Sequence, residues 1–217
     1  MSSLGMWVVG AVPDRAAVSL PDEFVHLVAE GDFRRPEGFA ETLAWWSEGC
    51  AGEPFFARDG SDPAVLLPTA AGRRFADLVH GAHPETAATE AIRDASLELM
   101  PAEGSAAGVF CAVARKASPV AALYYGLGAE AAGLLPGWFG DFLLPADDVR
   151  AALPDAERAL RIDGERRAVV LGRIGDWMTG MGDAPGFAAE ELLDGPLEVL
   201  RHAVEAGLGV AAFSRWY

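Results

Sequence analysis

Basic residues are scarce in this sequence, and lysine is almost absent. Seventeen Lys and Arg residues stand against 32 Asp and Glu residues, which gives a formal net charge of −15 at pH 7. Nucleic-acid-binding proteins neutralise phosphates with basic side chains, so we expect no nucleic-acid partner. The same charge would attract a basic protein. Lys116 is the only lysine, and it would have to supply any Schiff-base or phosphate-binding amine.

Cysteine is also scarce, and long apolar runs are missing. Cys50 and Cys111 are the only cysteines. No secretory leader pattern opens the chain, and no stretch approaches the roughly 20 apolar residues that a membrane helix requires. Two cysteines without an export signal predict buried thiols in a reducing compartment rather than a disulfide. We therefore expect a cytoplasmic protein with no membrane contact. The preference for arginine over lysine, with abundant Ala and Gly, indicates a high-GC, actinobacterial genome.

Several motifs that carry chemistry are missing as well. The sequence contains no G-x-x-x-x-G-K-[ST], G-x-S-x-G, H-E-x-x-H or C-x-x-C pattern. These absences argue against a P-loop nucleotide site, a nucleophile elbow, and the common zinc sites. We expect neither a cofactor nor a metal.

The composition and the predicted elements indicate one α+β domain over residues 1–217. Hydrophobic residues make up 51% of the 217 residues, enough for a sizeable core. Strands are predicted at 6–12, 108–114 and 209–213. Helices are predicted at 36–48, 69–80, 84–99, 145–153 and 196–206. Because the strands are dispersed and no regular βαβ alternation emerges, we expect several helices packed on a small mixed or antiparallel sheet.

Some elements are less sharply defined by the pattern. A helix is predicted to begin at Pro21 and to end at Gly31, with Phe24, Leu27 and Val28 on one face. The helix over 84–99 is expected to bury a stripe of Ala88, Ile92, Ala95 and Leu99. Residues 120–125 and 168–174 fit either a strand or a helix, although Ser118–Pro119 is a good helix start.

Three polar or glycine-rich patterns are interpreted as structural. Gly126 and Gly128 begin a G-x-G-x-x-A pattern like that of dinucleotide folds, but without a convincing second strand we interpret it as a helix end or turn. Two sets of His and acidic residues have spacings that could offer metal ligands. They are Asp22, His26 and Glu30, and Asp77, His80, His83 and Glu85. We interpret the first as a solvated polar face, and the second by the place of His80 at a helix end, where the helix dipole favours a cation.

Asp141 is the strongest catalytic candidate. It lies among apolar residues, Trp138, Phe139, Phe142, Leu143 and Leu144. A carboxyl group in apolar surroundings favours its protonated form and could act as a general acid. A turn after Gly140 is the alternative explanation. Trp138 and Phe139 are then candidate binding residues beside Asp141.

Two aromatic pairs add further binding candidates. Neighbouring residues of a regular helix or strand cannot both point inward, so one member of each pair could line a pocket or interface. The pairs are Trp45–Trp46 and Phe55–Phe56. We name Trp46 and Phe56 as candidate binding residues. The nearby pair Arg58 and Asp59 completes the set.

Two stretches resemble the YfbM-like bacterial domain of unknown function. One runs from Pro119 to Leu153 and includes Phe142-Leu-Leu-Pro-Ala-Asp-Asp-Val149, and the other runs from Leu197 to Phe213. Together they cover about a quarter of the chain. The resemblance implies an α+β fold and transfers neither an activity nor site residues.

Two functional hypotheses follow. The first is an acidic binding protein, of the immunity type or an accessory factor, for a basic protein partner. The second is a metal-independent enzyme of specialised metabolism that acts on a small molecule with a carboxylate such as Asp141 in an aromatic-lined pocket. The sequence favours the first because it is strongly acidic and lacks a catalytic motif.

Overall fold

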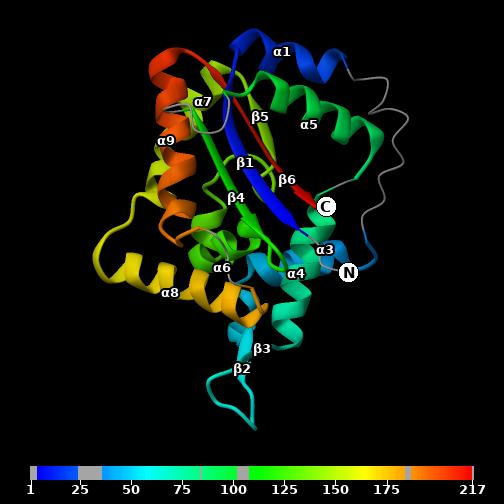
Figure 1. Cartoon of the computed structure of the whole chain (residues 1–217), viewed down its shortest axis with the longest axis vertical. Helices are drawn as coiled ribbons and strands as arrows, with labels where there is room; N and C mark the ends of the chain where they lie inside the picture. The colour runs from blue at the N-terminus through cyan, green and yellow to red at the C-terminus, as the bar shows by residue number, and fades with distance from the viewer. Residues whose placement is uncertain (1–3, 24–35, 84, 102–107, 184–186, 217) are drawn as a thin grey trace.

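A four-stranded antiparallel sheet forms the centre of the molecule (Figure 1). The computed structural model describes residues 4–23, 36–83, 85–101, 108–183 and 187–216. The strand order is β4–β1–β6–β5, with bounds Val109–Ala114, Gly5–Val12, Gly209–Trp216 and Phe142–Leu144 respectively. A separate hairpin of β2 (Phe56–Arg58) and β3 (Leu66–Pro68) projects from one end of the molecule. The α+β prediction is confirmed, and the central sheet is antiparallel.

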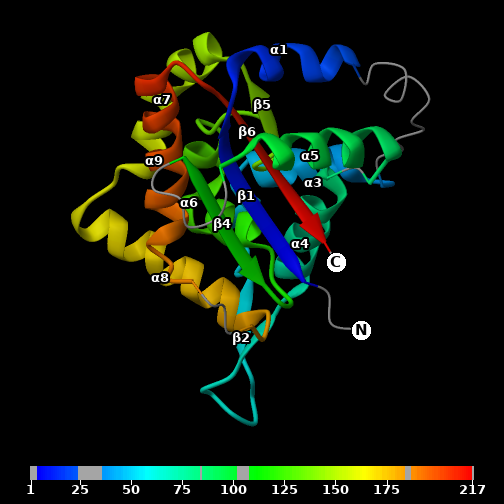
Figure 2. The ribbon, with the colours of Figure 1, turned by 45° about the horizontal axis from the view of Figure 1, so that its top comes forward.

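Helices cover both faces of this sheet (Figure 2). Helices α6 (Pro119–Ala132), α7 (Ala146–Leu160) and α9 (Glu191–Ala206) contact one face. Helices α1 (Asp14–Glu23) and α5 (Ala87–Leu99) cover the other. Beyond α6 lie α3 (Phe39–Ser47), α4 (Ala70–Ala82) and α8 (Gly164–Gly180), and the short 3-10 helix η1 (Cys50–Gly52) follows α3. The arrangement explains why β1 is apolar along its whole length.

Strand β1 illustrates this two-sided burial. Alternate residues of a strand point to opposite faces. Trp7 and Val9 belong to the large core beneath α6 and α9. Val12 packs with Ala17 of α1 and with Ala211 of β6 on the opposite face. The strand predicted at 6–12 is therefore confirmed, and its continuous apolar run is typical of a strand that is buried on both sides.

Residues 120–125, whose sequence fits either a strand or a helix, are helical. The Ser118 hydroxyl accepts a hydrogen bond from the Ala121 amide at 3.2 Å, and Pro119 occupies the first turn. An oxygen-bearing N-cap followed by proline favours a helix start at this point. Residues 168–174 are likewise helical, as part of α8.

The glycine pattern within α6 serves helix packing. A Cβ atom at Gly126 would lie 2.7 Å from a side-chain carbon of Ile174 and 3.2 Å from the carbonyl oxygen of Val170, both on α8. Gly128 has a φ of 76° and kinks the helix. A dinucleotide fingerprint instead requires a turn between a strand and a helix. This geometry supports a structural role for Gly126 and Gly128, in the packing and the kink of α6.

The first helix begins earlier than predicted. The Pro13 carbonyl accepts hydrogen bonds from the Ala16 and Ala17 amides, so α1 starts directly after β1. Pro21 therefore lies inside α1 rather than at its start. The predicted continuation through Phe24 to Gly31 lies outside the described residues.

Helix α5 buries the predicted apolar stripe only in part, and Ile92 and Ala95 are half-buried. Ala88 is buried as expected, but Leu99 is 39% exposed. Arg93 and Ser96 are instead only 5% and 1% exposed. An apolar pattern cannot reveal this orientation, because Arg93 turns inward to meet charged groups that come from distant parts of the chain.

No helix in the described part of the chain is long and apolar enough to cross a membrane. Neither cysteine forms a disulfide, as predicted, but burial of both thiols was also predicted and holds only for Cys50. Cys50 is buried and Cys111 is partly exposed. Burial raises the pKa of the Cys50 thiol to about 11.

Candidate functional site

A tight turn places Asp141 next to the sheet. The backbone amide of Trp138 donates to the Asp141 carbonyl at 2.9 Å, and the Asp141 amide donates back to the Trp138 carbonyl at 3.0 Å. The two residues between them have positive φ angles, 46° for Phe139 and 86° for Gly140. Two such residues form the two-residue turn that suits a hairpin. A positive φ is ordinary for glycine but strained for phenylalanine.

The surrounding core holds this strained turn in place. The Trp7 indole donates to the Gly140 carbonyl at 3.1 Å, and the Gly140 amide donates to the Tyr124 hydroxyl at 3.1 Å. The Phe139 ring stacks on the Tyr124 ring with centroids 5.1 Å apart. Nε2 of His83 lies 2.9 Å from the Phe139 carbonyl oxygen and donates to it. Burial raises the pKa of Tyr124, which keeps its hydroxyl protonated. The turn that carries Asp141 is therefore held by contacts from three parts of the chain, at Trp7, His83 and Tyr124.

The Asp141 carboxylate is surrounded by hydrogen-bond donors. Its Oδ2 atom accepts from Nη2 of Arg93 at 3.0 Å, and its Oδ1 atom accepts from the Ser214 backbone amide at 2.7 Å. Nε2 of His83 lies 3.4 Å from Oδ1. The expectation of purely apolar surroundings was wrong, because Arg93 is brought in from α5. The candidate general acid is thus held in an ion pair.

Further charged residues extend this ion pair. Nη1 of Arg93 donates to Oε1 of Glu90 at 2.6 Å. The other Glu90 oxygen receives Nη2 of Arg215 at 2.8 Å, and Nη1 of Arg215 contacts Oδ1 of Asp94 at 2.7 Å. We call Glu90, Arg93, Asp94, Asp141 and Arg215 the charged cluster. It links α5, the turn before β5 and the end of β6.

An apolar cavity lies on one side of the charged cluster. Its volume is about 360 Å³, and it lies between α5 and the β5–β6 edge of the sheet (Figure 2 shows α5 over this face). Its apolar lining includes Ile92, Trp138, Phe142, Leu143 and Phe213. The polar part of the lining includes Arg93, Asp141 and the buried hydroxyl of Ser96. We call this space the apolar cavity.

Two of the predicted site residues, Asp141 and Trp138, lie together in the lining of the apolar cavity. Trp138 is 38% exposed, so part of its side chain reaches solvent. Phe139 and Trp46 line a different, smaller cavity of about 230 Å³. The sequence therefore indicated residues of one wall of the apolar cavity, but it did not show that the helix predicted at 84–99 would form the opposite wall.

Trp46 and Phe56 belong to an aromatic core. The Trp46 ring lies 4.3 Å from that of Phe75, and the Phe56 ring lies 5.6 Å from that of Trp177. The Phe75 and Trp177 rings in turn pack edge to face at 5.3 Å. Trp46 is 5% exposed, whereas Phe56 is half-buried at the base of the hairpin. Their contacts fit packing of the hairpin onto the helices.

Arg58 and Asp59 lie in the β2–β3 hairpin, which projects away from the sheet (Figure 1). The Arg58 guanidinium donates to the Pro63 carbonyl across the loop. The Ser61 backbone amide donates to Oδ1 of Asp59 at 3.0 Å and lowers the pKa of that carboxyl. Arg58 and Asp59 thus make these contacts within the hairpin itself, and the structure does not bring them to Asp141.

The histidine patterns do not assemble a metal site in the described residues. No group of three His, Cys, Asp or Glu side chains suited to a metal ion occurs there. His80 packs its ring against Trp216, and His83 approaches Asp141. His26 and Glu30 lie outside the described residues.

Arg93, Glu90 and Arg215 were not recognised from the sequence. The sequence does place Glu90 and Arg93 three residues apart on a predicted helix, a spacing that permits an ion pair. It gives no sign that the pair is turned inward. Arg93 and Asp141 are separated by 48 residues, so only the fold brings them together.

No protein-family model matches the chain, and neither a curated protein nor a solved structure matches it at a significant level. The resemblance to the YfbM-like domain stays a prediction. The candidate site is therefore defined by the geometry of the apolar cavity and the charged cluster.

Proposed function

We propose that this protein binds a small amphipathic molecule in the apolar cavity. One observation carries the proposal: a cavity of about 360 Å³ combines an apolar lining with a few fixed polar groups. Ligand sites in proteins typically have volumes of about 300–1,000 Å³ and the same division between apolar walls and a few polar groups.

The polar groups give the cavity a defined orientation. Arg93 and Asp141 are held by the charged cluster, and Ser96 is buried on α5 next to them in the lining. Groups that are fixed before binding lose little conformational entropy when a ligand arrives. The apolar part of the ligand would contact Ile92 and Phe142, while a polar group would face Arg93 and Asp141.

Filling the cavity should abolish this binding. We expect the Ile92→Trp variant to bind 8-anilinonaphthalene-1-sulfonate at least about tenfold more weakly than the wild type, because the indole would occupy the space that the ligand needs. Fluorescence titration measures the affinity. Val169→Trp is the matched control, since Val169 is 55% exposed on α8 and away from the cavity. Equal affinity of the Ile92→Trp variant and the wild type would contradict the proposal.

Whether a reaction follows binding depends on Asp141. We retain the enzyme hypothesis as a form of the same proposal, because Asp141 and Trp138 line the cavity together. Once the ligand is identified, Asp141→Asn should separate the two forms. If the protein is an enzyme, the wild type would convert the ligand, and the Asp141→Asn variant would bind it without converting it. If the protein only binds the ligand, the wild type too would release it unchanged. Mass spectrometry of the ligand after incubation makes this measurement.

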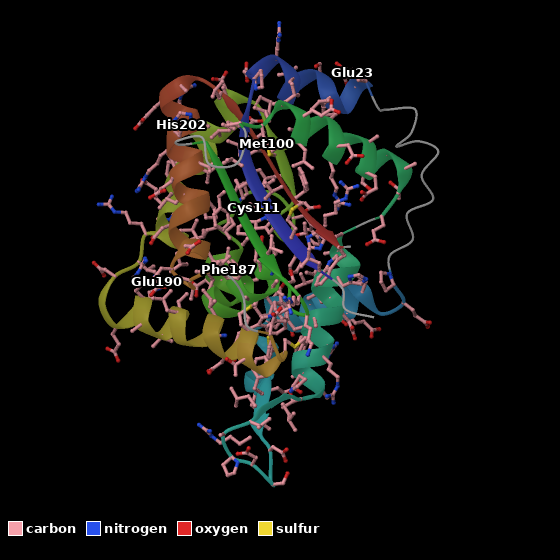
Figure 3. All side chains as sticks on the ribbon, viewed as in Figure 1. Glu23, Met100, Cys111, Phe187, Glu190 and His202 are labelled. Carbon is pink, nitrogen blue, oxygen red and sulfur yellow. The ribbon has the colours of Figure 1, made fainter. Side chains whose placement is uncertain are left out.

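A second candidate function is an acidic surface for a basic protein, as in an immunity-type or accessory factor. A groove of about 380 Å³ runs between the start of β4 and α9. Its lining contains the exposed carboxylates of Glu190, Glu191, Asp194 and Glu198. Figure 3 labels Glu190, which precedes α9. Together with the net charge of −15, these carboxylates favour an arginine- or lysine-rich partner.

Removing two of these charges should weaken such an interaction. We expect the Glu190→Gln/Glu198→Gln variant to bind an arginine-rich peptide about fivefold more weakly, with a smaller dependence on salt. Isothermal titration calorimetry at two salt concentrations measures both effects. Glu41→Gln/Glu48→Gln removes two exposed carboxylates around α3 and serves as the control. An equal loss in both double variants would assign the effect to net charge and remove the groove from consideration.

We also propose that the protein works in the cytoplasm. Its two cysteines form no disulfide, which suits a reducing compartment.

A further inference from the structure

Strand β4 forms one edge of the central sheet, beside α9 (Figure 2). Its sequence, Val-Phe-Cys-Ala-Val-Ala, contains neither a charged residue nor a proline, which are the residues that commonly protect an exposed strand edge. The opposite edge strand, β5, has only three residues and contacts α1 and α7. Among the described residues, β4 pairs with β1 alone. The sheet is therefore open to another strand at β4.

The phase of the β1–β4 pairing shows which backbone groups of β4 point outward. The Ala11 amide donates to the Gly108 carbonyl at 2.7 Å, which continues the register of the two strands by one pair. In an antiparallel pair, such hydrogen-bonded residues alternate with residues whose N–H and C=O groups point away from the neighbouring strand. The residues of β4 that point outward are then Val109, Cys111 and Val113. Val109 and Val113 make no hydrogen bond on that side within the described residues.

An apolar strip lies beside this open edge, on the face of β4 that is turned away from α9. Phe110 and Ala112 belong to the core beneath α6 and α9. Because side chains alternate along a strand, those of Val109 and Val113 point to the other face. Val113 is 38% exposed there, and Val109 is half-buried. We call these two side chains the apolar strip.

On the α9 side, the same edge borders the groove between β4 and α9, which we call the acidic groove. Phe110 lies in its wall on the β4 side, and the carboxylates lie along the other wall. One of them, Asp194, pairs with Arg167 at 2.7 Å. Glu190 and Glu198 are exposed and form no ion pair within the described part of the chain. These two carboxylates are available to cationic side chains of a partner.

An antiparallel strand added at this edge would present its alternate side chains to the two surfaces. Its residues opposite Val109 and Val113 would exchange backbone hydrogen bonds with β4, and their side chains would contact the apolar strip. The residues in between, such as the one opposite Phe110, would point toward the acidic groove. The first set should therefore be apolar and the second set basic.

We infer that β4 binds an extended segment of a partner protein as an added antiparallel strand, in which basic residues alternate with apolar residues. The inference rests on the second candidate function, a basic protein partner, and specifies the form of the segment that binds. In this mode of recognition the backbone hydrogen bonds give affinity and the alternate side chains give specificity.

The charges disfavour a second copy of this chain as the partner. An antiparallel pair of two β4 strands would place both acidic grooves on the same face of the joined sheet. The unpaired carboxylates of Glu190 and Glu198 from the two copies would then repel one another. A basic segment from another protein meets no such repulsion.

Two peptides of identical composition test the inference. Arg-Val-Arg-Val-Arg-Val-Arg alternates the two residue types, whereas Arg-Arg-Arg-Arg-Val-Val-Val separates them, and both are acetylated and amidated. In isothermal titration calorimetry the alternating peptide should bind at least about tenfold more tightly. Equal affinities that both fall in the Glu190→Gln/Glu198→Gln variant would overturn strand addition and leave the acidic groove as a site for charge alone. No binding of either peptide would overturn both.

N-methylation of the alternating peptide locates its backbone hydrogen bonds. Its valine amides should donate to β4, and its arginine amides should point to solvent. Methylation of the valine nitrogens should weaken binding at least about tenfold, whereas methylation of the arginine nitrogens should change the affinity less than about threefold. Equal effects of the two modifications, or the reverse order, would overturn the antiparallel arrangement.

Val113→Pro is the matching variant of the protein. It removes the outward N–H of Val113 and spares the pairing with β1, in which that amide takes no part. The variant should bind the alternating peptide at least about fivefold more weakly, and Val113→Thr, which keeps the N–H, should bind it like the wild type. Circular dichroism checks that both variants are folded. Equal affinity of a folded Val113→Pro variant and the wild type would contradict strand addition at β4.

Discussion

Replacing Arg93 by alanine is expected to lower the free energy of unfolding by about 3 kcal/mol. The Arg93 side chain is 6% exposed, and it donates to both Asp141 and Glu90. The variant would leave two partly buried carboxylates facing each other without the guanidinium between them. Breaking a buried ion pair costs about 3–5 kcal/mol, and the lower end applies because both carboxylates keep some contact with solvent.

Urea denaturation measures this effect, and an exposed ion pair supplies the control. Arg150 pairs with Asp147 at the surface of α7, where the two side chains are 58% and 92% exposed. Arg150→Ala should change the stability by less than about 0.5 kcal/mol, as is usual for exposed pairs. Arg93→Lys should recover only part of the loss, because one ammonium group cannot replace a planar fork that spans two carboxylates. Similar stabilities of Arg93→Ala and Arg150→Ala would contradict a structural role for the charged cluster.

Replacing Phe75 by alanine is expected to cost about 4 kcal/mol of stability. Phe75 has no solvent exposure and lies at the centre of the aromatic core. Its ring contacts those of Trp46, Phe55 and Trp177, with centroids 4.3, 5.4 and 5.3 Å away. Truncation would remove a large apolar surface and leave a cavity that these rigid rings cannot easily fill.

Thermal and urea unfolding of Phe75→Ala measure this cost. The tryptophan fluorescence should also change, because Trp46 and Trp177 both pack on the Phe75 ring. Dye binding in the apolar cavity should survive at temperatures where the variant is folded, since none of these residues lines that cavity. A cost below about 1.5 kcal/mol would show that the aromatic core is loosely packed, and would reopen Trp46 and Phe56 as ligand contacts.

Much of the fold was predictable because local chemistry decides it. Ser118–Pro119 marks the start of α6, and Gly207, with a φ of 67°, ends α9. The acidic pair Asp147–Asp148 occupies the first turn of α7, where the helix dipole favours it. These features act over a few residues, so a single sequence displays them fully.

The three-residue strands β2 and β3 were not predicted, because so few residues carry too little local information. The side chains of Asp59 and Asp62 accept backbone hydrogen bonds within the loop. Strands of three residues, however, are too short to show an alternating pattern. The pairing of Phe56 with Pro68 depends on packing against α8 and the aromatic core.

The candidate site was only half predictable. Asp141 and Trp138 were candidate site residues because a carboxyl group among aromatic residues is unusual. Arg93 did not, because an arginine on an amphipathic helix normally faces solvent. Its burial depends on partners 48 residues away in Asp141 and on the β6 strand near the end of the chain. Long-range charge pairing of this kind leaves no periodic mark in a sequence.

Native mass spectrometry of the protein purified from its own host tests the central proposal most directly. A small molecule should be retained at a ratio of one per chain, and the Ile92→Trp variant purified in the same way should lack it. A bare chain in both proteins, or a molecule retained equally by the variant, would contradict binding in the apolar cavity. A basic protein that co-purifies at a fixed ratio would instead support the acidic groove of α9 and β4 as the functional surface.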